Sequence, residues 1–507
     1  MTTYKKLRAT IATMMTMGVL CAMPAGFAAE ATPTAAAQVT EQTATAAPAQ
    51  QTSKPFATVR VGKKWGAVAP SGSLVIPAEY DEIASYSADA VAVRQGKNWG
   101  IVRLDGTVIV PAIYKAIHPL AADTIIVQNT KDMYGAYDTA GKLLLRVEYR
   151  SVTPFYDGIS RVERKDKKFV FYRRDGSLLT SDAYLWASRF SEGLAVVEPT
   201  KNKMGYIDTN GSEAIPVQFE NAMIFQEGLA PVAVKKKWGF IDKSGTMVIQ
   251  PQFRAKSIGG FSDGLAMIKE KKHWAFIDKT GAKVIQTRYE DVDSFENGLA
   301  EVRREVKVGL LGGFLTSAVS FATGIPTFGV GTDLIGEKVK RGYIDKTGAE
   351  IISTKNDYNS FFFDGVALVR VRSKWGMVDR KGAYVVEPKY KGIHFFYDDL
   401  AAVQDGDKWG FVGRDGKIVI EPKYDEVHDF TDGIAAVQQG GKSFFIDKTG
   451  RVPFLLPNNI TDIGMFRDGF APVKIGDKWG FIDKTGTVVI PPAYTEVRTY
   501  QVTTDSL

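Results

Sequence analysis

A nine-residue phrase recurs along the chain at nearly constant spacing, with clear copies at 237–245 (KWGFIDKSG) and 478–486 (KWGFIDKTG). The position of its tryptophan can be followed through twelve copies, at residues 65, 99, 134, 169, 204, 238, 274, 341, 375, 409, 443 and 479. Neighbouring copies are 34 to 36 residues apart, except for one step of 67 between 274 and 341. A fixed period of this length predicts an array of small supersecondary units instead of several unlike domains.

Each copy carries the signals of three short strands. An apolar run such as 229–234 precedes the run with the tryptophan, and a β-branched run such as 487–490 follows the phrase and often ends in proline. The Asp-Lys-Thr-Gly tetrapeptide fits a type I turn with its glycine at positive φ. This glycine is present in all twelve copies, for example Gly245, Gly281 and Gly486, as a left-handed backbone requires. The sequence therefore predicts an all-β array of three-stranded antiparallel meanders.

A single meander cannot cover both of its faces, so neighbouring units must stack. An open, twisted β-superhelix accepts any number of copies, and we favour it because propeller blades usually have about 40 residues and four strands. The alternative is one or two β-propellers, in which the copies must close into rings.

The recurring Trp-Gly phrase resembles the bacterial WG-repeat family, and the resemblance extends from residue 56 to the C-terminus. It implies a secreted or envelope-associated binding protein. The family offers no catalytic residues to carry over.

The tryptophan position holds different residue types in different copies. Seven copies have tryptophan, namely Trp65, Trp99, Trp238, Trp274, Trp375, Trp409 and Trp479, and five have Tyr134, Phe169, Met204, Arg341 or Ser443. Replacement by other large apolar groups favours a buried packing role. The glycine after it, as in Gly239, indicates close backbone approach. Exposed rings that stack on sugars are the alternative.

One copy contains an insertion. Ala230 precedes Trp238 by 8 residues, whereas Ala300 precedes Arg341 by 41, so about 33 extra residues lie in one hairpin connection, at 304–340. Residues 308–332 have no formal charge. Such a segment is expected to pack on the array, dock to a partner protein or contact a membrane surface. The candidate binding residues are its large apolar side chains: Leu310, Leu311, Phe314, Leu315, Phe321, Ile325 and Phe328.

The N-terminus has the pattern of a Sec-type signal peptide over 1–28: Lys5, Lys6 and Arg8, then an apolar stretch, and small residues before a cleavage site near Ala28. This predicts a periplasmic or secreted bacterial protein. An Ala-, Thr-, Pro- and Gln-rich disordered linker is expected over 29–54. Repeats 1–7 and the start of repeat 8 occupy 55–303, the remainder of repeat 8 and repeats 9–12 occupy 341–500, and 501–507 forms a tail.

Few residues suggest chemistry. The only cysteine, Cys21, lies in the signal segment, so neither disulfides nor thiolate metal sites are expected. We interpret the four histidines as occupying different positions within the repeat, without the spacing of metal ligands. We interpret periodic acids such as Asp242 and Asp263 as turn residues. The net charge of +7 over 507 residues argues against nucleic acid as a partner. No cofactor, metal or enzymatic activity is expected.

The sequence thus favours an envelope scaffold that binds a protein, with 304–340 as a docking element. Alternatives are a carbohydrate- or peptidoglycan-binding module and a hydrolase whose site lies between repeats. The sequence leaves the partner and the oligomeric state open.

Overall fold

The structure, a computed structural model, describes residues 57–305 and 339–499. These residues belong to one compact unit that spans Thr52–Leu507. Every element in the described ranges is a strand, and the strands form twelve antiparallel sheets, ten with four strands and two with three. We number these sheets as blades 1 to 12 in chain order, from the blade that contains β1. The predicted signal peptide (1–28), linker (29–54) and tail (501–507) lie outside the described residues.

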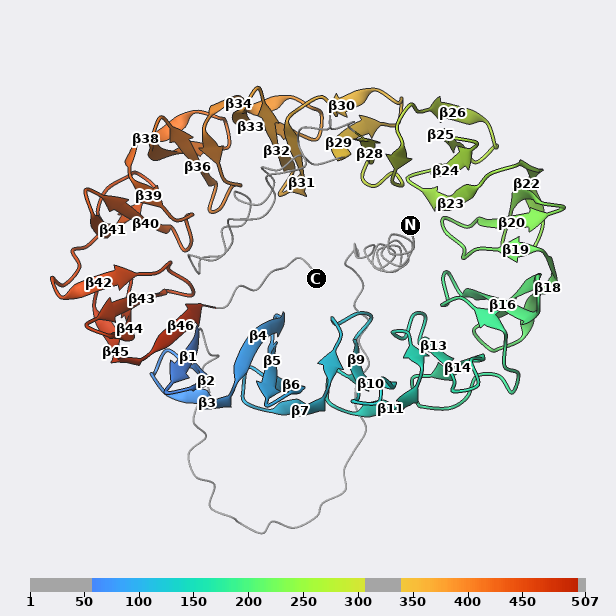
Figure 1. Ribbon diagram of the computed structural model, residues 1–507, viewed down its shortest axis with the longest axis horizontal. Helices are drawn as coiled ribbons and strands as arrows, with labels where there is room; N and C mark the ends of the chain where they lie inside the picture. The colour runs from blue at the N-terminus through green and yellow to red at the C-terminus, as the bar shows by residue number, and fades with distance from the viewer. Residues whose placement is uncertain (1–56, 306–338, 500–507) are drawn as a thin grey trace, which may run out of the picture. The chain divides into compact units, whose positions relative to one another are not determined.

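The same strand order recurs in every blade, and Figure 1 shows the first strand toward the middle of the ring and the last toward its outside. The first strands are β4 (Glu82–Ser87), β8 (Ala116–Ile117), β12 (Ser151–Val152), β15 (Trp186–Ala187), β19 (Asn221–Ala222), β23 (Ser257–Ser262), β27 (Asp291–Val292), β31 (Tyr358–Phe363), β35 (Gly392–Ile393), β39 (Glu426–Val427), β42 (Ile460–Ile463) and, in blade 1, β46 (Glu496–Thr499). The second strands are β1 (Ala57–Val61), β5 (Ala90–Gln95), β9 (Thr124–Gln128), β13 (Ile159–Glu163), β16 (Leu194–Thr200), β20 (Ala230–Val234), β24 (Leu265–Glu270), β28 (Leu299–Glu305), β32 (Val366–Val371), β36 (Leu400–Asp405), β40 (Ile434–Gln439) and β43 (Phe470–Ile475).

The third strands carry the Trp-Gly phrase. They are β2 (Lys64–Val68), β6 (Asn98–Arg103), β10 (Tyr134–Asp138), β14 (Phe169–Arg173), β17 (Lys203–Asp208), β21 (Lys237–Ile241), β25 (His273–Ile277), β29 (Val339–Asp345), β33 (Lys374–Asp379), β37 (Lys408–Gly413), β41 (Lys442–Asp447) and β44 (Lys478–Asp483). The fourth strands, which blades 4 and 11 lack, are β3 (Leu74–Tyr80), β7 (Val108–Tyr114), β11 (Leu143–Tyr149), β18 (Glu213–Phe219), β22 (Met247–Phe253), β26 (Lys283–Gln286), β30 (Glu350–Ile352), β34 (Tyr384–Tyr390), β38 (Ile418–Tyr424) and β45 (Val488–Tyr494).

The array closes on itself. Blade 1 combines both ends of the repeat region, because β46 pairs antiparallel with β1 from Ala57↔Thr499 to Arg60↔Glu496. The result is a single ring of twelve blades (Figure 1). The favoured prediction, an open superhelix, was therefore wrong, and the propeller alternative describes the fold. Closure has a physical advantage, because it leaves no end blade with an uncovered apolar face.

The prediction of three strands per unit was also incomplete. In seven blades the additional first strand has only two residues, too few for a recognisable pattern. In blade 6, for example, β19 pairs through Asn221↔Ala233 and Ala222↔Val232. This strand comes directly after the fourth strand of the preceding blade, so the aromatic that closes one repeat leads straight into the next blade.

Apolar packing between blades forms the core. There are twelve hydrophobic clusters, and each joins two consecutive blades. One cluster packs Tyr206 of blade 5 against Phe225 of blade 6, and another packs Phe481 of blade 12 against Val59 of blade 1. The second and third strands are buried on both faces for this reason, which explains their continuous apolar runs. Stability therefore comes from nearest-neighbour contacts all around the ring.

The turn and glycine predictions are confirmed. The Gly245 N–H donates to the Asp242 carbonyl at 3.0 Å, and Gly245 has φ +85°. Positive φ is found at all twelve turn glycines: 72, 106, 141, 176, 211, 245, 281, 348, 382, 416, 450 and 486. The glycine after the tryptophan has a different role, because a Cβ at Gly239 would collide with the Ile249 carbonyl oxygen on the bulged fourth strand.

Replacing such a glycine should destabilise the ring. A Cβ at Gly480 would lie 2.5 Å from the Ile490 carbonyl oxygen, a backbone atom that cannot move aside cheaply. We expect Gly480→Ala to lower the free energy of unfolding by about 1–3 kcal/mol, as overpacking does, measured by urea denaturation. Gly413→Ala is the matched control, since its Cβ would meet only side-chain atoms, at 3.3 Å. Equal midpoints for the two variants would contradict the steric explanation.

Candidate functional site

Six periodic carboxylates link neighbouring blades. In the Phe-x-Asp/Glu-Gly turns, the carboxylate accepts a hydrogen bond from the glycine N–H of the next blade, as Glu192 does from Gly228 at 3.1 Å. The other pairs are Asp157 with Gly193, Glu227 with Gly264, Asp263 with Gly298, Asp398 with Gly433, and Asp432 with Gly469. Lys243 of the Asp-Lys-Ser-Gly turn joins Glu192 as well, at 3.1 Å. Asp263 is therefore more than the turn residue that the sequence suggested.

The tryptophans of the repeat phrase lie between packed side chains. Trp65 and Trp274 are 4% and 5% exposed, and the other five are half-buried. The residue opposite each ring on the second strand is often a cation placed over it: Arg60 on Trp65, Arg94 on Trp99, Lys269 on Trp274, Arg370 on Trp375 and Lys474 on Trp479, at 4.6 to 6.0 Å. Rings that are covered in this way offer little open face for stacking on a sugar.

Blade 8 replaces this arrangement with an ionic cluster. Arg341, in the tryptophan position, lies 3.0 Å from Glu301. The side chain of Arg303 contacts Glu301 at 2.8 Å and Asp293 at 2.5 Å. Burial raises the pKa of Asp293, although the Arg303 charge opposes this shift. These paired charges explain how an arginine is tolerated at a position that is otherwise mostly apolar.

The insertion begins and ends in blade 8. Strands β28 and β29 pair from Leu299↔Asp345 to Glu305↔Val339, so the hairpin ladder includes the first and last residues of the 304–340 segment. The candidate binding residues Leu310, Leu311, Phe314, Leu315, Phe321, Ile325 and Phe328 lie outside the described residues.

Three of the four histidines share one repeat phase, so the expectation of different phases was wrong. His118, His394 and His428 each follow a two-residue first strand, and each N–H donates to a second-strand carbonyl at 2.9 Å. The short strand that defines this phase was missed in the sequence, which hid the pattern. The His394 imidazole Nδ1 lies 2.7 Å from Asp429 Oδ1 of the next blade. Within residues 57–305 and 339–499, no three His, Cys, Asp or Glu side chains are grouped to hold a metal.

An exposed group of aromatic side chains lies on the first-strand side of blades 9 and 10. We name Phe361, Phe363, Phe395 and Tyr397 the aromatic patch. Phe395 has ring centroids 6.0 Å from Phe361 and 5.1 Å from Phe363, and Phe363 lies 6.1 Å from Tyr397. Phe361 is 57% exposed and Tyr397 37%. The patch therefore places aromatic surface in solvent where two adjacent blades meet.

The repeat itself does not require these aromatics. They flank the phenylalanine of the turn between the first and second strands, which is Phe362 (half-buried) in blade 9 and Phe396 (buried) in blade 10, where the turn reads Phe-Tyr-Asp-Asp. The flanking positions are Ser294 and Glu296 in blade 8, and Asp429 and Thr431 in blade 11. The sequence contains this feature, an aromatic residue on each side of the turn phenylalanine in two successive repeats, but it was not identified from the sequence alone.

A bulge explains the exposure of Phe361. The register of β31 with β32 shifts between Asn359 and Phe362. Within the bulge, Ser360 is buried, and its hydroxyl accepts from the Leu368 N–H at 2.8 Å. Successive side chains of a strand point to opposite sides, so Phe361 faces solvent. Strand β31 lies toward the middle of the ring (Figure 1).

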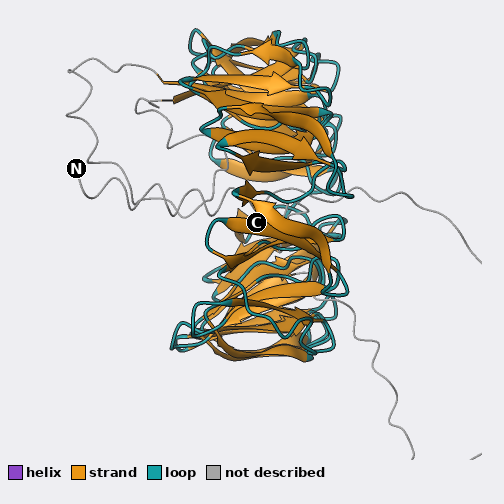
Figure 2. Cartoon of the chain, turned by 90° about the vertical axis from the view of Figure 1, so that its right-hand side faces the viewer, coloured by secondary structure: helices purple, strands orange, loops and turns teal. Residues whose placement is uncertain are grey.

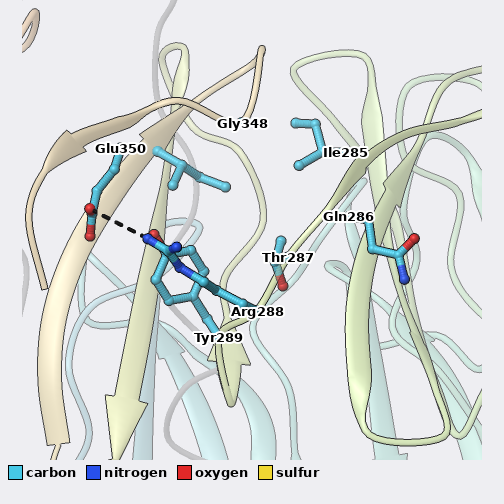
Figure 3. A pocket seen from close by; sticks show the side chains of 8 residues that line it. Ile285, Gln286, Thr287, Arg288, Tyr289, Gly348 and Glu350 are labelled. Atoms are coloured by element: carbon cyan, nitrogen blue, oxygen red, sulfur yellow. Dashed lines mark ion pairs between the residues drawn. The ribbon is translucent and has the colours of Figure 1, made fainter.

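A shallow cavity of about 360 Å³ lies between blades 7 and 8. It is lined by Ile285, Gln286, Thr287, Arg288, Tyr289, Ile344, Gly348 and Glu350 (Figure 3). Its cause is local, since β26 has four residues and β30 three, where most fourth strands have seven. Arg288 and Glu350 form a pair at 3.9 Å across it. A single paired carboxylate beside a tyrosine does not supply the two carboxylates that glycoside hydrolysis uses.

In the part of the chain that the structure describes, no helix is long and apolar enough to span a bilayer.

Comparison with known proteins identifies the repeat. The family model described as "WG containing repeat" matches residues 65–99, 99–130, 134–169, 204–238, 238–272, 274–305, 342–375, 375–409, 409–442, 444–479 and 479–501, which together make up well over half of the chain. No curated protein matches the sequence.

Several solved structures align with the chain, but with low scores. A eukaryotic initiation factor has 11% identity over 79% of this chain and 95% of its own, with a TM-score of 0.30. BamB from Moraxella catarrhalis has 12% identity over 66% and 91%, with a TM-score of 0.25. The WD40 β-propeller domain of Doa1 has 12% identity over 50% and 94%, with a TM-score of 0.24. At these scores the likenesses carry no argument about function.

The turn aspartates should make the ring sensitive to acid. Hydrogen bonds from the Thr449 and Thr485 hydroxyls hold the pKa values of Asp447 and Asp483 below the ordinary value of 3.8. A carboxyl whose pKa is lowered by folding stabilises the fold above its unfolded pKa, and this contribution is lost as pH falls through the folded pKa. We expect the urea concentration at the unfolding midpoint to decrease when the pH is lowered below about 4. The double variant Asp447→Asn with Asp483→Asn should show a smaller decrease.

The control for this measurement is Glu387→Gln with Glu421→Gln, which removes two exposed acids outside the turns. An identical pH profile for both double variants would contradict a role for the turn aspartates.

Proposed function

Because the chain belongs to the family of WG containing repeats, we propose that it is a repeat scaffold that binds a protein partner, and that the aromatic patch is its contact surface. The observation that carries this proposal is the exposure of Phe361 and Tyr397 at positions where neighbouring blades have small or polar residues. Large aromatic side chains supply much of the binding energy of protein interfaces.

The patch is separate from the packing that holds the ring together. The twelve inter-blade clusters are built from other residues, among them Phe396 and Ile393 at the same blade junction; Phe395 packs against that cluster only from its edge. An exposed aromatic that adds little to folding is costly in water unless a partner covers it. The neighbouring His394–Asp429 pair adds polar groups at the margin, as the rim of an interface does.

The proposed setting is the cell envelope. The basic and apolar pattern of residues 1–28 supports export to the periplasm or secretion. The uncharged segment 308–332 supports a second docking element beside blade 8. In this proposal the working part is a surface, and the protein performs no chemistry.

Truncation of the patch should reduce binding and spare the fold. We expect Phe361→Ala with Phe395→Ala to weaken retention of a partner from periplasmic extract at least about tenfold, as the loss of two interface aromatics does. A photo-crosslinking residue at 361 should give a discrete protein adduct in cells. The free energy of unfolding should fall by no more than about 1 kcal/mol, because Phe361 is exposed and Phe395 is half-buried at the edge of the patch.

The matched control is Ile113→Ala with Tyr384→Ala, two exposed apolar side chains on fourth strands, 59% and 47% exposed. Equal retention by both double variants would contradict the proposal. Binding of the parent to purified cell wall, with loss in the patch variant and no protein adduct, would favour the carbohydrate-binding alternative.

A further inference from the structure

The strand order of the blades gives the ring two chemically different faces. In every blade the connection between the second and third strands lies at one end of the hairpin, and the Asp-Gly turns lie at the other end. Because the blades repeat the same order, all second-to-third connections lie on one face, which we call the lysine-turn face. Figure 2 shows the ring from its side, with loops along both flat faces.

Lysines are concentrated on this face in four consecutive blades. The connections in blades 4 to 7 and the first residues of β17 and β21 contain ten of them: Lys165, Lys167, Lys168, Lys201, Lys203, Lys235, Lys236, Lys237, Lys271 and Lys272. We call these residues the lysine arc. All are exposed except Lys237, which is half-buried. Blades 4 to 7 are packed in sequence through three inter-blade clusters, so the ten ammonium groups form one continuous region.

The charges of the arc are not neutralised within the described residues. None of the ten lysines has an ion pair there, whereas lysines on the same face elsewhere do, such as Lys64 with Asp81 at 2.7 Å and Lys391 with Asp407 at 2.8 Å. Three acids near the arc are paired with other cations: Asp166 with Arg164, Glu163 with Arg150, and Glu270 with Lys283. Glu198 and Glu220 accept backbone N–H groups, from Asn202 and Lys236, and remain two carboxylates beside ten lysines. The arc is therefore a region of uncompensated positive charge, hidden in the small net charge of the whole chain.

Clusters of lysines bind proteins to anionic membrane surfaces, because each ammonium group near the surface is attracted to the negative head groups.

We propose that the lysine-turn face binds an anionic lipid surface, with the lysine arc as the electrostatic contact. A flat row of turns fits a flat surface, and ammonium groups on long stems reach phosphate groups without fixed geometry. Nucleic acid is the competing polyanion, because Arg164 lies in the blade 4 connection and Trp186 of blade 5 is 37% exposed, and the test below distinguishes the two. This inference goes beyond the proposed protein-binding function and does not depend on the aromatic patch.

The test is flotation of the full chain with vesicles of phosphatidylcholine alone or with about 30% phosphatidylglycerol, at about 0.05 M and about 0.5 M salt. The arc variant is K167E/K201E/K235E/K271E. The matched control is K142E/K381E/K417E/R451E, which changes the charge equally at exposed turn positions on the opposite face. We expect the parent and the control to bind anionic vesicles at low salt, and the arc variant to lose at least about tenfold in partitioning.

Equal binding by the arc variant, or binding by the parent to neutral vesicles, would overturn the proposal. So would absence of vesicle binding with retention on DNA, which would assign the arc to nucleic acid. The neutral variant K167Q/K201Q/K235Q/K271Q should show an intermediate loss of vesicle binding. It serves as a control for misfolding of the charge-reversal variant. The F361A/F395A variant should float like the parent, which separates this test from that of the protein-binding function.

Discussion

Each blade presents apolar side chains on both of its faces, and coverage of both faces by neighbouring blades is the constraint on which the structure depends. Tyr206 and Phe225, or Phe481 and Val59, do not belong to the core of one sheet but lie between two. A blade alone would expose the apolar side chains of both its faces to water. An apolar cluster lies at every junction, and at six of the twelve a carboxylate link between turns, such as Glu192 to the Gly228 N–H, adds to it. This leaves the ring edges and loops free to vary.

Local features were predictable from sequence, because they depend on local backbone chemistry. Gly245 and its equivalents need positive φ, and the glycine after tryptophan needs close strand approach, wherever the unit sits. Closure was not predictable, because β46 and β1 lie more than 400 residues apart in sequence and their pairing depends on the small rotation between blades summed around the ring. The two-residue first strands were missed because a bridge such as Asn221↔Ala233 leaves no periodic pattern. The shared phase of His118, His394 and His428 was missed with them.

The surfaces that distinguish this chain arise where single copies depart from the repeat. Phe361, Phe363, Phe395 and Tyr397 occupy positions that the adjacent blades 8 and 11 fill with small or polar side chains, and the ionic cluster around Arg303 replaces a tryptophan-centred arrangement. The lysine arc arises in the same way, from connections in four adjacent blades in which lysines outnumber acids. Total composition concealed it, because 57 acids offset most of the 64 basic residues of the whole chain. The repeated residues determine the fold, and the residues that differ between copies determine which surfaces can bind a partner.

The pairing of β46 with β1 also bears on how such a chain can change during evolution. An open solenoid gains or loses a unit by duplication or deletion with one new end contact. In this ring each junction turns the chain by about a twelfth of a circle, so one unit more or less would require all remaining junctions to open or tighten together. A change in the number of copies is therefore unfavourable. Changes in loop length are tolerated more easily, as in the long connection between Glu305 and Val339.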